Sequence, residues 1–124
     1  MDDLKKPRAG LTDRFTEIAN SIEGLRIRQM FGMPTGFVGG NMATGLHQET
    51  FIVRLPEETR QERLAAGWSR FEPMPGRPMR EYLALPPEVA ADPAAVRVWF
   101  EIAVAYVLTL SAKEPRMRTS RAKA

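Results

Sequence analysis

The stretch that decides the fold of this 124-residue chain is IRQMFGMPTGFVGGNMATGLHQETFIVRL, from Ile27 to Leu55. Its pattern predicts several consecutive strands joined by turns. Gly39, Gly40 and Asn41 are residue types that tolerate the positive φ of tight turns, and they give the clearest hairpin signal. Near the end of the stretch, apolar residues at every second position, Phe51, Val53 and Leu55, share one face of a strand. We therefore expect antiparallel strands over residues 26–31, 35–38, 41–47 and 50–55.

Helical patterns lie on both sides of this stretch. Apolar residues recur at spacings of three and four from Leu11 to Ile22, which places them on one helix face. Pro56 and the two glutamates after it favour a helix start, as do Asp92 and Pro93 further along. We therefore expect an N-terminal helix, a short middle helix and a long C-terminal helix.

The segment from Trp68 to Pro78 is rich in residues that interrupt regular structure. It holds three prolines and a glycine, and proline lacks the donor that a central strand needs. We expect a loop here, pinned by the aromatic rings of Trp68 and Phe71. Residues 79–85 then predict a further strand.

These elements predict an α+β fold in a single domain, with an antiparallel sheet of four to five strands and flanking N-terminal, middle and long C-terminal helices. A chain of this length buries a core without disulfides or metal. We divide it into a flexible N-terminus over residues 1–10, the domain over residues 11–112 and a basic, flexible tail over residues 113–124.

The composition of the chain indicates its cellular compartment. The chain has no cysteine, which excludes disulfides and thiolate zinc sites and fits a reducing compartment. Its N-terminus lacks the apolar core of a signal peptide, and its most apolar window, residues 96–110, is too short to cross a bilayer. We expect a cytoplasmic protein with no membrane contact.

The formal net charge of +3 arises mainly from the C-terminal tail. Such a tail is a candidate contact for nucleic acid or for an acidic partner. The alternative is a solvated, frayed terminus, which is the interpretation we favour. The basic residues concerned are Lys113, Arg116, Arg118, Arg121 and Lys123.

The long C-terminal helix is apolar around most of its circumference. Trp99 and Phe100 belong to its broad apolar face, whereas Val98, Val104 and Leu108 lie outside that face. A helix of this kind is either buried between two layers or contributes to an oligomer interface. The three residues outside the face are therefore candidate interface residues of a homodimer.

Several short motifs follow one another in a fixed order: MFG at Met30–Gly32, Gly36 and Phe37, NMATGL at Asn41–Leu46, FIVRL at Phe51–Leu55, the Ala66–Ser69 turn with Phe71 and Pro73, and Tyr82–Pro87. This order resembles the TfoX N-terminal-domain family, named for the TfoX/Sxy regulators of bacterial competence, over roughly residues 15–110. The resemblance implies an α+β fold with a curved antiparallel sheet and flanking helices.

The same resemblance implies a regulatory role. In full-length competence regulators this domain is followed by a helical C-terminal domain, and the pair acts in transcriptional activation alongside a cyclic-AMP receptor protein. The present chain resembles the first of these domains alone, so we expect a stand-alone relative. The resemblance carries over no catalytic residues.

Residue chemistry gives no catalytic, metal or cofactor site, and we expect no cofactor. His47 is the only histidine, so one chain can form neither a histidine metal cluster nor a Ser-His-Asp triad. We interpret His47 as an exposed turn residue. The glycines of the strand region do not match phosphate-loop spacing, and turns and bulges explain them.

Two sets of side chains in the strand region, methionines and arginines, are candidates for a binding surface on the sheet. Methionine adapts to varied partners, and several methionines are placed to meet on one side of the sheet, although core filling is the simpler explanation. Arginines flank the strands and make a cationic surface if they project from one face. The sets are Met30, Met33, Met42, Met74 and Met79, and Arg26, Arg28, Arg54, Arg77 and Arg80.

We therefore expect a non-enzymatic regulatory or protein-interaction module with an unknown protein partner, linked by the resemblance to transcription or competence regulation. A homodimer is one candidate assembly. Two alternatives stay open. The first is nucleic-acid binding through the basic tail and the sheet arginines, and the second is a small-ligand or enzymatic role in a cleft between the sheet and the helices.

Overall fold

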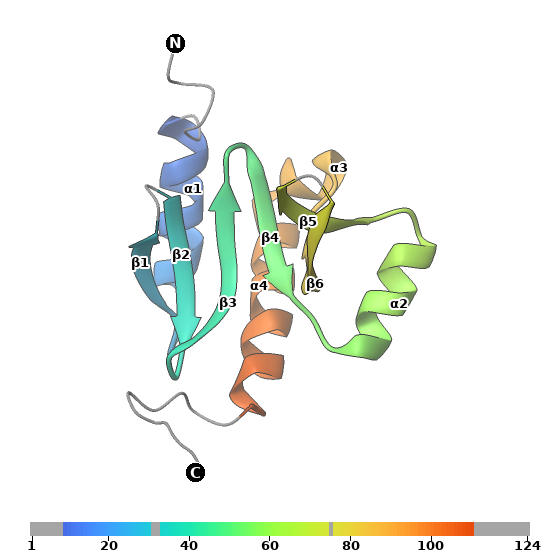
Figure 1. Ribbon diagram of the computed structural model, residues 1–124. Helices are drawn as coiled ribbons and strands as arrows, with labels where there is room; N and C mark the ends of the chain where they lie inside the picture. The colour runs from blue at the N-terminus through green and yellow to red at the C-terminus, as the bar shows by residue number, and fades with distance from the viewer. Residues whose placement is uncertain (1–8, 31–32, 75, 111–124) are drawn as a thin grey trace.

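An antiparallel sheet crosses the whole molecule (Figure 1). The computed structural model describes residues 9–30, 33–74 and 76–110, and within them the sheet has six strands in the order β1-β2-β3-β4-β6-β5. Every neighbouring pair is antiparallel. The strands are β1 (Arg26–Met30), β2 (Met33–Val38), β3 (Asn41–His47), β4 (Thr50–Arg54), β5 (Ser69–Met74) and β6 (Arg77–Ala84).

Helices accompany the sheet, so the α+β prediction is confirmed. α4 begins at the predicted N-cap, where a side-chain oxygen of Asp92 accepts a hydrogen bond from the N–H of Ala94 at 3.1 Å. α2 begins after Pro56 with two glutamates in its first turn, also as predicted. The helices of the described ranges are α1 (Ala9–Asn20), α2 (Glu57–Ala65), the unpredicted α3 (Pro87–Ala90) and α4 (Pro93–Leu108).

The sheet has more strands than the four to five that the sequence predicts. The additional strand is β5, which occupies the segment predicted to be a loop. β5 lies at an edge, and its described neighbour is β6, so Pro73 removes no hydrogen bond that a second neighbour needs. Pro34 in β2 precedes Thr35, where the pairing with β3 begins. Its missing N–H therefore removes no hydrogen bond of the described pairing with β3.

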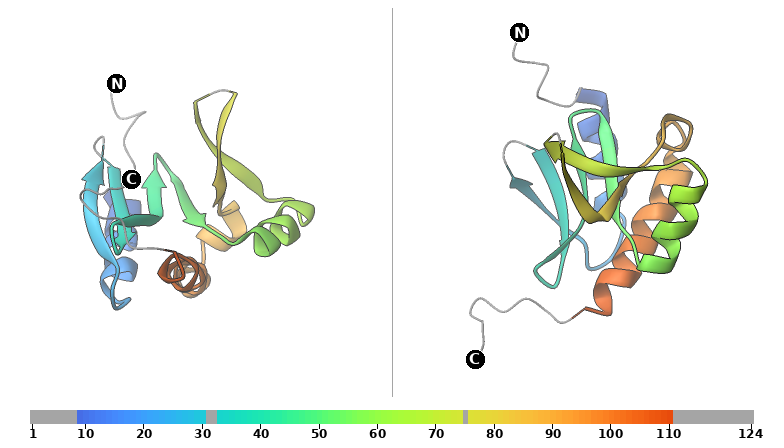
Figure 2. Two further views of the ribbon diagram at one scale, coloured as in Figure 1. Left: turned by 60° about the horizontal axis from the view of Figure 1, so that its bottom comes forward. Right: turned by 45° about the vertical axis from the view of Figure 1, so that its right-hand side comes forward.

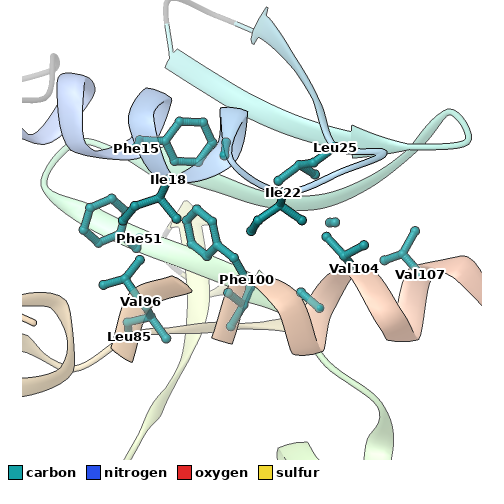
Figure 3. Packing of buried hydrophobic residues seen from close by; sticks show 14 of the residues in the cluster. Phe15, Ile18, Ile22, Leu25, Phe51, Leu85, Val96, Phe100, Val104 and Val107 are labelled. Atoms are coloured by element: carbon teal, nitrogen blue, oxygen red, sulfur yellow. The ribbon is translucent and has the colours of Figure 1, made fainter. Parts of the chain in front are cut away.

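One face of the sheet packs against α1 and α4 and forms the core (Figure 3). Phe15 of α1, Phe51 of β4 and Phe100 of α4 are fully buried there. The ring centroids of Phe15 and Phe100 lie 5.5 Å apart and those of Phe51 and Phe100 6.1 Å apart, both edge to face. Val53 and Leu55 share this face with Phe51, as the alternating pattern predicts.

α4 packs against both the sheet and α1, so a wide arc of its surface is buried. Val104, predicted to lie outside the buried face, belongs to the core and keeps 6% of its surface exposed. The structure corrects the prediction for this residue, because the helix is covered by two neighbours and not by one. Val98 and Leu108 are exposed, at 51% and 66%, and remain candidate interface residues.

The opposite face of the sheet, which we call the open face, carries no helix among the described residues (Figure 2, left). The β1–β2 and β5–β6 hairpins rise on either side of β3 and β4, so this face is concave. A second cluster of buried side chains lies on it, formed by Ile52, Phe71 and Tyr82, with Met42 and Met79 packed against them.

Some predictions fall on residues that the structure does not describe. The predicted N-terminal segment lies outside the described residues up to residue 8, as do all of the tail 113–124 and Phe31 and Gly32 of the MFG motif. Within the described ranges, no helix has the length and apolar content needed to cross a membrane.

Candidate functional site

A cavity of about 300 Å³ lies on the open face, and we call it the methionine pocket. Each of the six described strands contributes to its lining. β1, β2, β3 and β6 contribute one methionine each, and β5 contributes Phe71. The methionines of the pocket are Met30, Met33, Met42 and Met79.

The strand register explains why these side chains meet. Directly opposed residues of an antiparallel pair project to the same face. Met30 opposes Met33, and Gly45 opposes both Thr35 of β2 and Ile52 of β4. Because Gly45 has no side chain, the open face is hollow between Thr35 and Ile52. The pocket therefore lies where β3 carries a glycine between two side-chain-bearing neighbours.

His47 closes one part of the pocket beside Phe71. Its ring centroid lies 5.0 Å from that of Phe71, edge to face. The residue lies at the end of β3 and is half-buried, which corrects the prediction of an exposed turn residue. Burial lowers the pKa of His47 from its usual value of 6.5, so the neutral imidazole is favoured.

A hydrogen-bonded group lies beside the pocket on β3, β4 and β6. The Tyr82 hydroxyl donates to the Met42 carbonyl at 3.1 Å, and Arg54 donates to the same carbonyl at 3.4 Å. Arg54 also pairs with Glu81 at 2.7 Å, and its guanidinium lies 5.6 Å from the centre of the Tyr82 ring. Burial raises the pKa of the Tyr82 phenol, which keeps it a donor. This group holds the backbone of Met42 in place.

The register also brings arginines to the open face. Arg26 opposes Phe37 and Arg28 opposes Thr35, so both project to the face that holds the pocket. The guanidinium carbon of Arg28 lies 5.6 Å from the centre of the Phe37 ring. Both arginines are exposed, and neither has an ion-pair partner among the described residues. Of the five arginines that the sequence suggested for a cationic sheet face, Arg26 and Arg28 project from the open face as exposed side chains, whereas Arg54 is engaged with Glu81.

A second hollow, of about 660 Å³, lies between the start of α1, the turn before β4 and α3. Two of its lining side chains, Arg14 and Trp68, already have partners. Arg14 donates to the Ala90 carbonyl at 3.2 Å, and the Trp68 ring lies 4.8 Å from that of Trp99. Arg63 lies over both indole rings, which ties α2 to α4. These contacts are structural, so the methionine pocket is the stronger candidate site.

For the methionines, sequence reasoning favoured core filling and gave their meeting on one side of the sheet as the alternative, and it missed other parts of the pocket. Four of the five predicted methionines line it, and the side chain of Met74 is not described. Turns and bulges explain Gly45 in the sequence, yet it lies inside β3 and faces the pocket. The available signal was that Gly45 and His47 are two residues apart on one strand and therefore share a face.

The predicted site residues on other elements are not brought together with the pocket. Val98 and Leu108 lie on α4, which packs on the opposite face of the sheet. The basic residues Lys113–Lys123 lie outside the described residues. Within the described ranges, no group of three or more His, Cys, Asp or Glu side chains is placed to hold a metal ion.

The fold and the pocket define a single-domain α+β module with a covered and an open sheet face. The family model of the TfoX N-terminal domain matches residues 17–106, which is most of the chain. The protein therefore belongs to the TfoX N-terminal domain family. No curated protein matches the chain.

Proposed function

We propose that this protein is a non-enzymatic regulatory module that binds a partner protein through its open face. Membership of the TfoX N-terminal domain family supports the regulatory class. The observation that carries the proposal is the methionine pocket, an apolar cavity on a sheet face without a described helix over it. Apolar surface of this kind marks interaction sites, and methionine side chains adapt to the partner they meet.

The chemistry of the pocket supports binding and not catalysis. His47 is the one titratable side chain among its described lining residues. A lone histidine lacks the second group that acid–base or nucleophilic catalysis requires within hydrogen-bond reach. The proposed setting is the cytoplasm, in the regulation of transcription or competence, as for the regulators after which the family is named.

Affinity capture from an extract of the source organism tests this proposal. The bait is the full chain, compared with a Gly45→Leu variant that fills the pocket and a Gly10→Leu control in α1. A Cβ at Gly45 meets Ile52 and Met42 at 3.5 Å, which is ordinary contact, and a Cβ at Gly10 meets nothing within 4 Å. Both variants should therefore fold, which circular dichroism and thermal unfolding would check.

The proposal expects a partner that the unchanged chain and the Gly10→Leu control retain and that the Gly45→Leu variant loses. Equal capture of that partner by the Gly45→Leu variant would place the interaction elsewhere on the molecule. Capture of no partner by any of the three baits would contradict the proposed module function.

Nucleic-acid binding is a second candidate function, favoured by Arg26 and Arg28 on the open face and by the basic sequence of residues 113–124. It would show as affinity for labelled duplex DNA that falls steeply with salt, with a log–log slope of about −0.9 per phosphate contact. Deletion of residues 113–124 should reduce that slope. Weak binding with a flat salt dependence would remove this candidate.

Self-association through α4 is proposed as a separate property of the module. Val98 and Leu108 are the exposed large apolar residues of this helix. Light scattering of the protein and of a Val98→Ser, Leu108→Ser double variant tests the idea. A dimer mass that falls to the monomer mass in the double variant supports it, and an unchanged mass contradicts it.

A further inference from the structure

We propose that the methionine pocket and the two neighbouring arginines, Arg26 and Arg28, together bind an acidic peptide segment of a partner protein. An apolar side chain of that segment fills the pocket, and a carboxylate next to it pairs with an arginine. This inference rests on the proposed interaction function and adds the chemistry of the partner.

The apolar part of the inference follows from the hydrogen-bonding state of the pocket. Thr35 is buried, and its hydroxyl donates to the Met33 carbonyl at 3.4 Å. His47 is held towards its neutral form. A polar group placed among the methionines, away from the His47 imidazole, would lose water without gaining a hydrogen-bond partner, which disfavours it. An aliphatic or aromatic side chain carries no such cost.

The methionines make the pocket adaptable to one such side chain. Thioether side chains have three rotatable bonds and form favourable contacts with aromatic rings. The volume of about 300 Å³ lies at the small end of the range for ligand cavities, about 300–1,000 Å³. An anchor of one or two side chains suits this size better than a large cofactor.

The acidic part follows from the position and state of the arginines. Arg28 opposes Thr35, which lines the pocket, and Arg26 is two residues along the same strand. Neither forms an ion pair with a described residue, in contrast to Arg54, which is engaged with Glu81. Arginine binds carboxylates through paired hydrogen bonds. The charge beside the pocket is therefore complementary to aspartate or glutamate.

Two other occupants fit less well. Residues 113–124 of this chain are basic, with five lysines or arginines against one glutamate, so Arg26 and Arg28 would repel them. A nucleic acid would satisfy the arginines through its phosphates, but its bases carry polar edges that the pocket does not match. Nucleic acid is therefore an outcome of the test and not the proposal.

Selection from a phage-displayed library of random heptapeptides tests the inference. The target is the full chain, with counter-selection on the Gly45→Leu variant. The expected peptides combine Leu, Ile, Met or Phe with neighbouring Asp or Glu. Fluorescence anisotropy of a selected peptide should show an affinity at least about tenfold weaker for Gly45→Leu and for Arg28→Glu. The Gly10→Leu control should bind as the unchanged chain does.

Several results would overturn the inference. They are the absence of enrichment over the Gly45→Leu target, enrichment of basic or uncharged peptides, and affinity that Arg28→Glu leaves unchanged. Competition of a selected peptide by single-stranded DNA at lower concentration than by an acidic peptide would also overturn it. If selection fails while partner capture still depends on Gly45, the module function stands and the acidic peptide class is wrong.

Discussion

The two faces of one sheet differ in what covers them. On the helix-covered face, Phe15, Phe51 and Phe100 are fully buried and interlock edge to face. On the open face, the buried large apolar side chains of the described residues are Ile52, Phe71 and Tyr82, and methionines packed beside them line a cavity. From this difference we expect the covered face to supply most of the stability, and the open face, which keeps an apolar cavity, is the surface that we propose for a partner.

The largest expected effect contrasts one residue from each face. Phe100→Ala removes a ring that packs on Phe15 and Phe51, and we expect a loss of about 3–5 kcal/mol in the free energy of unfolding. Met42→Leu on the open face conserves volume, so we expect a loss below about 1.5 kcal/mol. Urea unfolding of both variants measures the contrast. Equal losses would contradict the division of roles between the faces.

Two glycines sharpen the same comparison. A Cβ at Gly36 would lie 2.9 Å from Thr44 Cγ2 and 3.0 Å from Leu25 Cδ1, on the covered face. Thr44 is fully buried, and its hydroxyl donates to the Ile52 carbonyl at 2.6 Å, which holds its side chain in place. We therefore expect Gly36→Ala to lower the free energy of unfolding by about 1–3 kcal/mol.

Gly45→Ala is the matched change on the open face. The new methyl group would meet its neighbours at 3.5 Å, and the strand would lose less conformational entropy on folding. We expect stability to be unchanged or to rise by up to about 1 kcal/mol. Thermal unfolding of the two alanine variants side by side measures this. A larger loss in Gly45→Ala than in Gly36→Ala would show that the open face is as tightly packed as the core.

A smaller effect is expected at the hydrogen-bonded group beside the pocket. Tyr82→Phe removes the hydroxyl that donates to the Met42 carbonyl, so we expect a loss of about 1 kcal/mol. Arg54 still donates to the same carbonyl and limits the loss. Urea unfolding gives the value. A loss as large as that of Phe100→Ala would mean that this group, and not the phenylalanine core, holds the sheet together.

The smallest effect concerns pH. Burial lowers the folded-state pKa of His47 below its usual 6.5, so the unfolded chain binds the proton more readily. The contribution of His47 to stability is then present above pH 6.5 and is lost as the pH falls through the folded pKa. NMR titration of the imidazole should give a pKa below 6.5. A value at or above it would contradict the half-buried position.

The sequence predicts the elements whose local signals agree with their surroundings. β3 lies at the predicted residues 41–47, because Gly39 and Gly40 adopt the positive φ that the turn before it requires. β5 is missed because its proline argues against a strand, and its place at the sheet edge, which removes that objection, is a property of the assembled sheet.

The candidate site is predictable only in part, because it depends on how the strands pair in the assembled sheet. The sequence shows five methionines in the strand region, but the register decides which of them meet. A register irregularity between Gly36 and Phe37 of β2 lies in the middle of this region, and no local pattern fixes it. Val104 is misplaced because its burial depends on the position of α1 as well as that of the sheet.

The most direct test of the central claim is NMR of the protein with labelled methionine methyl groups while the captured partner or a selected peptide is added. The account predicts that the signals of the pocket methionines Met30, Met33, Met42 and Met79 shift. Labelled valine and leucine methyl groups of the core, such as Val107, should stay unchanged. Unchanged methionine signals, together with shifts at Val98 and Leu108 on α4, would contradict the claim that the open face is the binding surface.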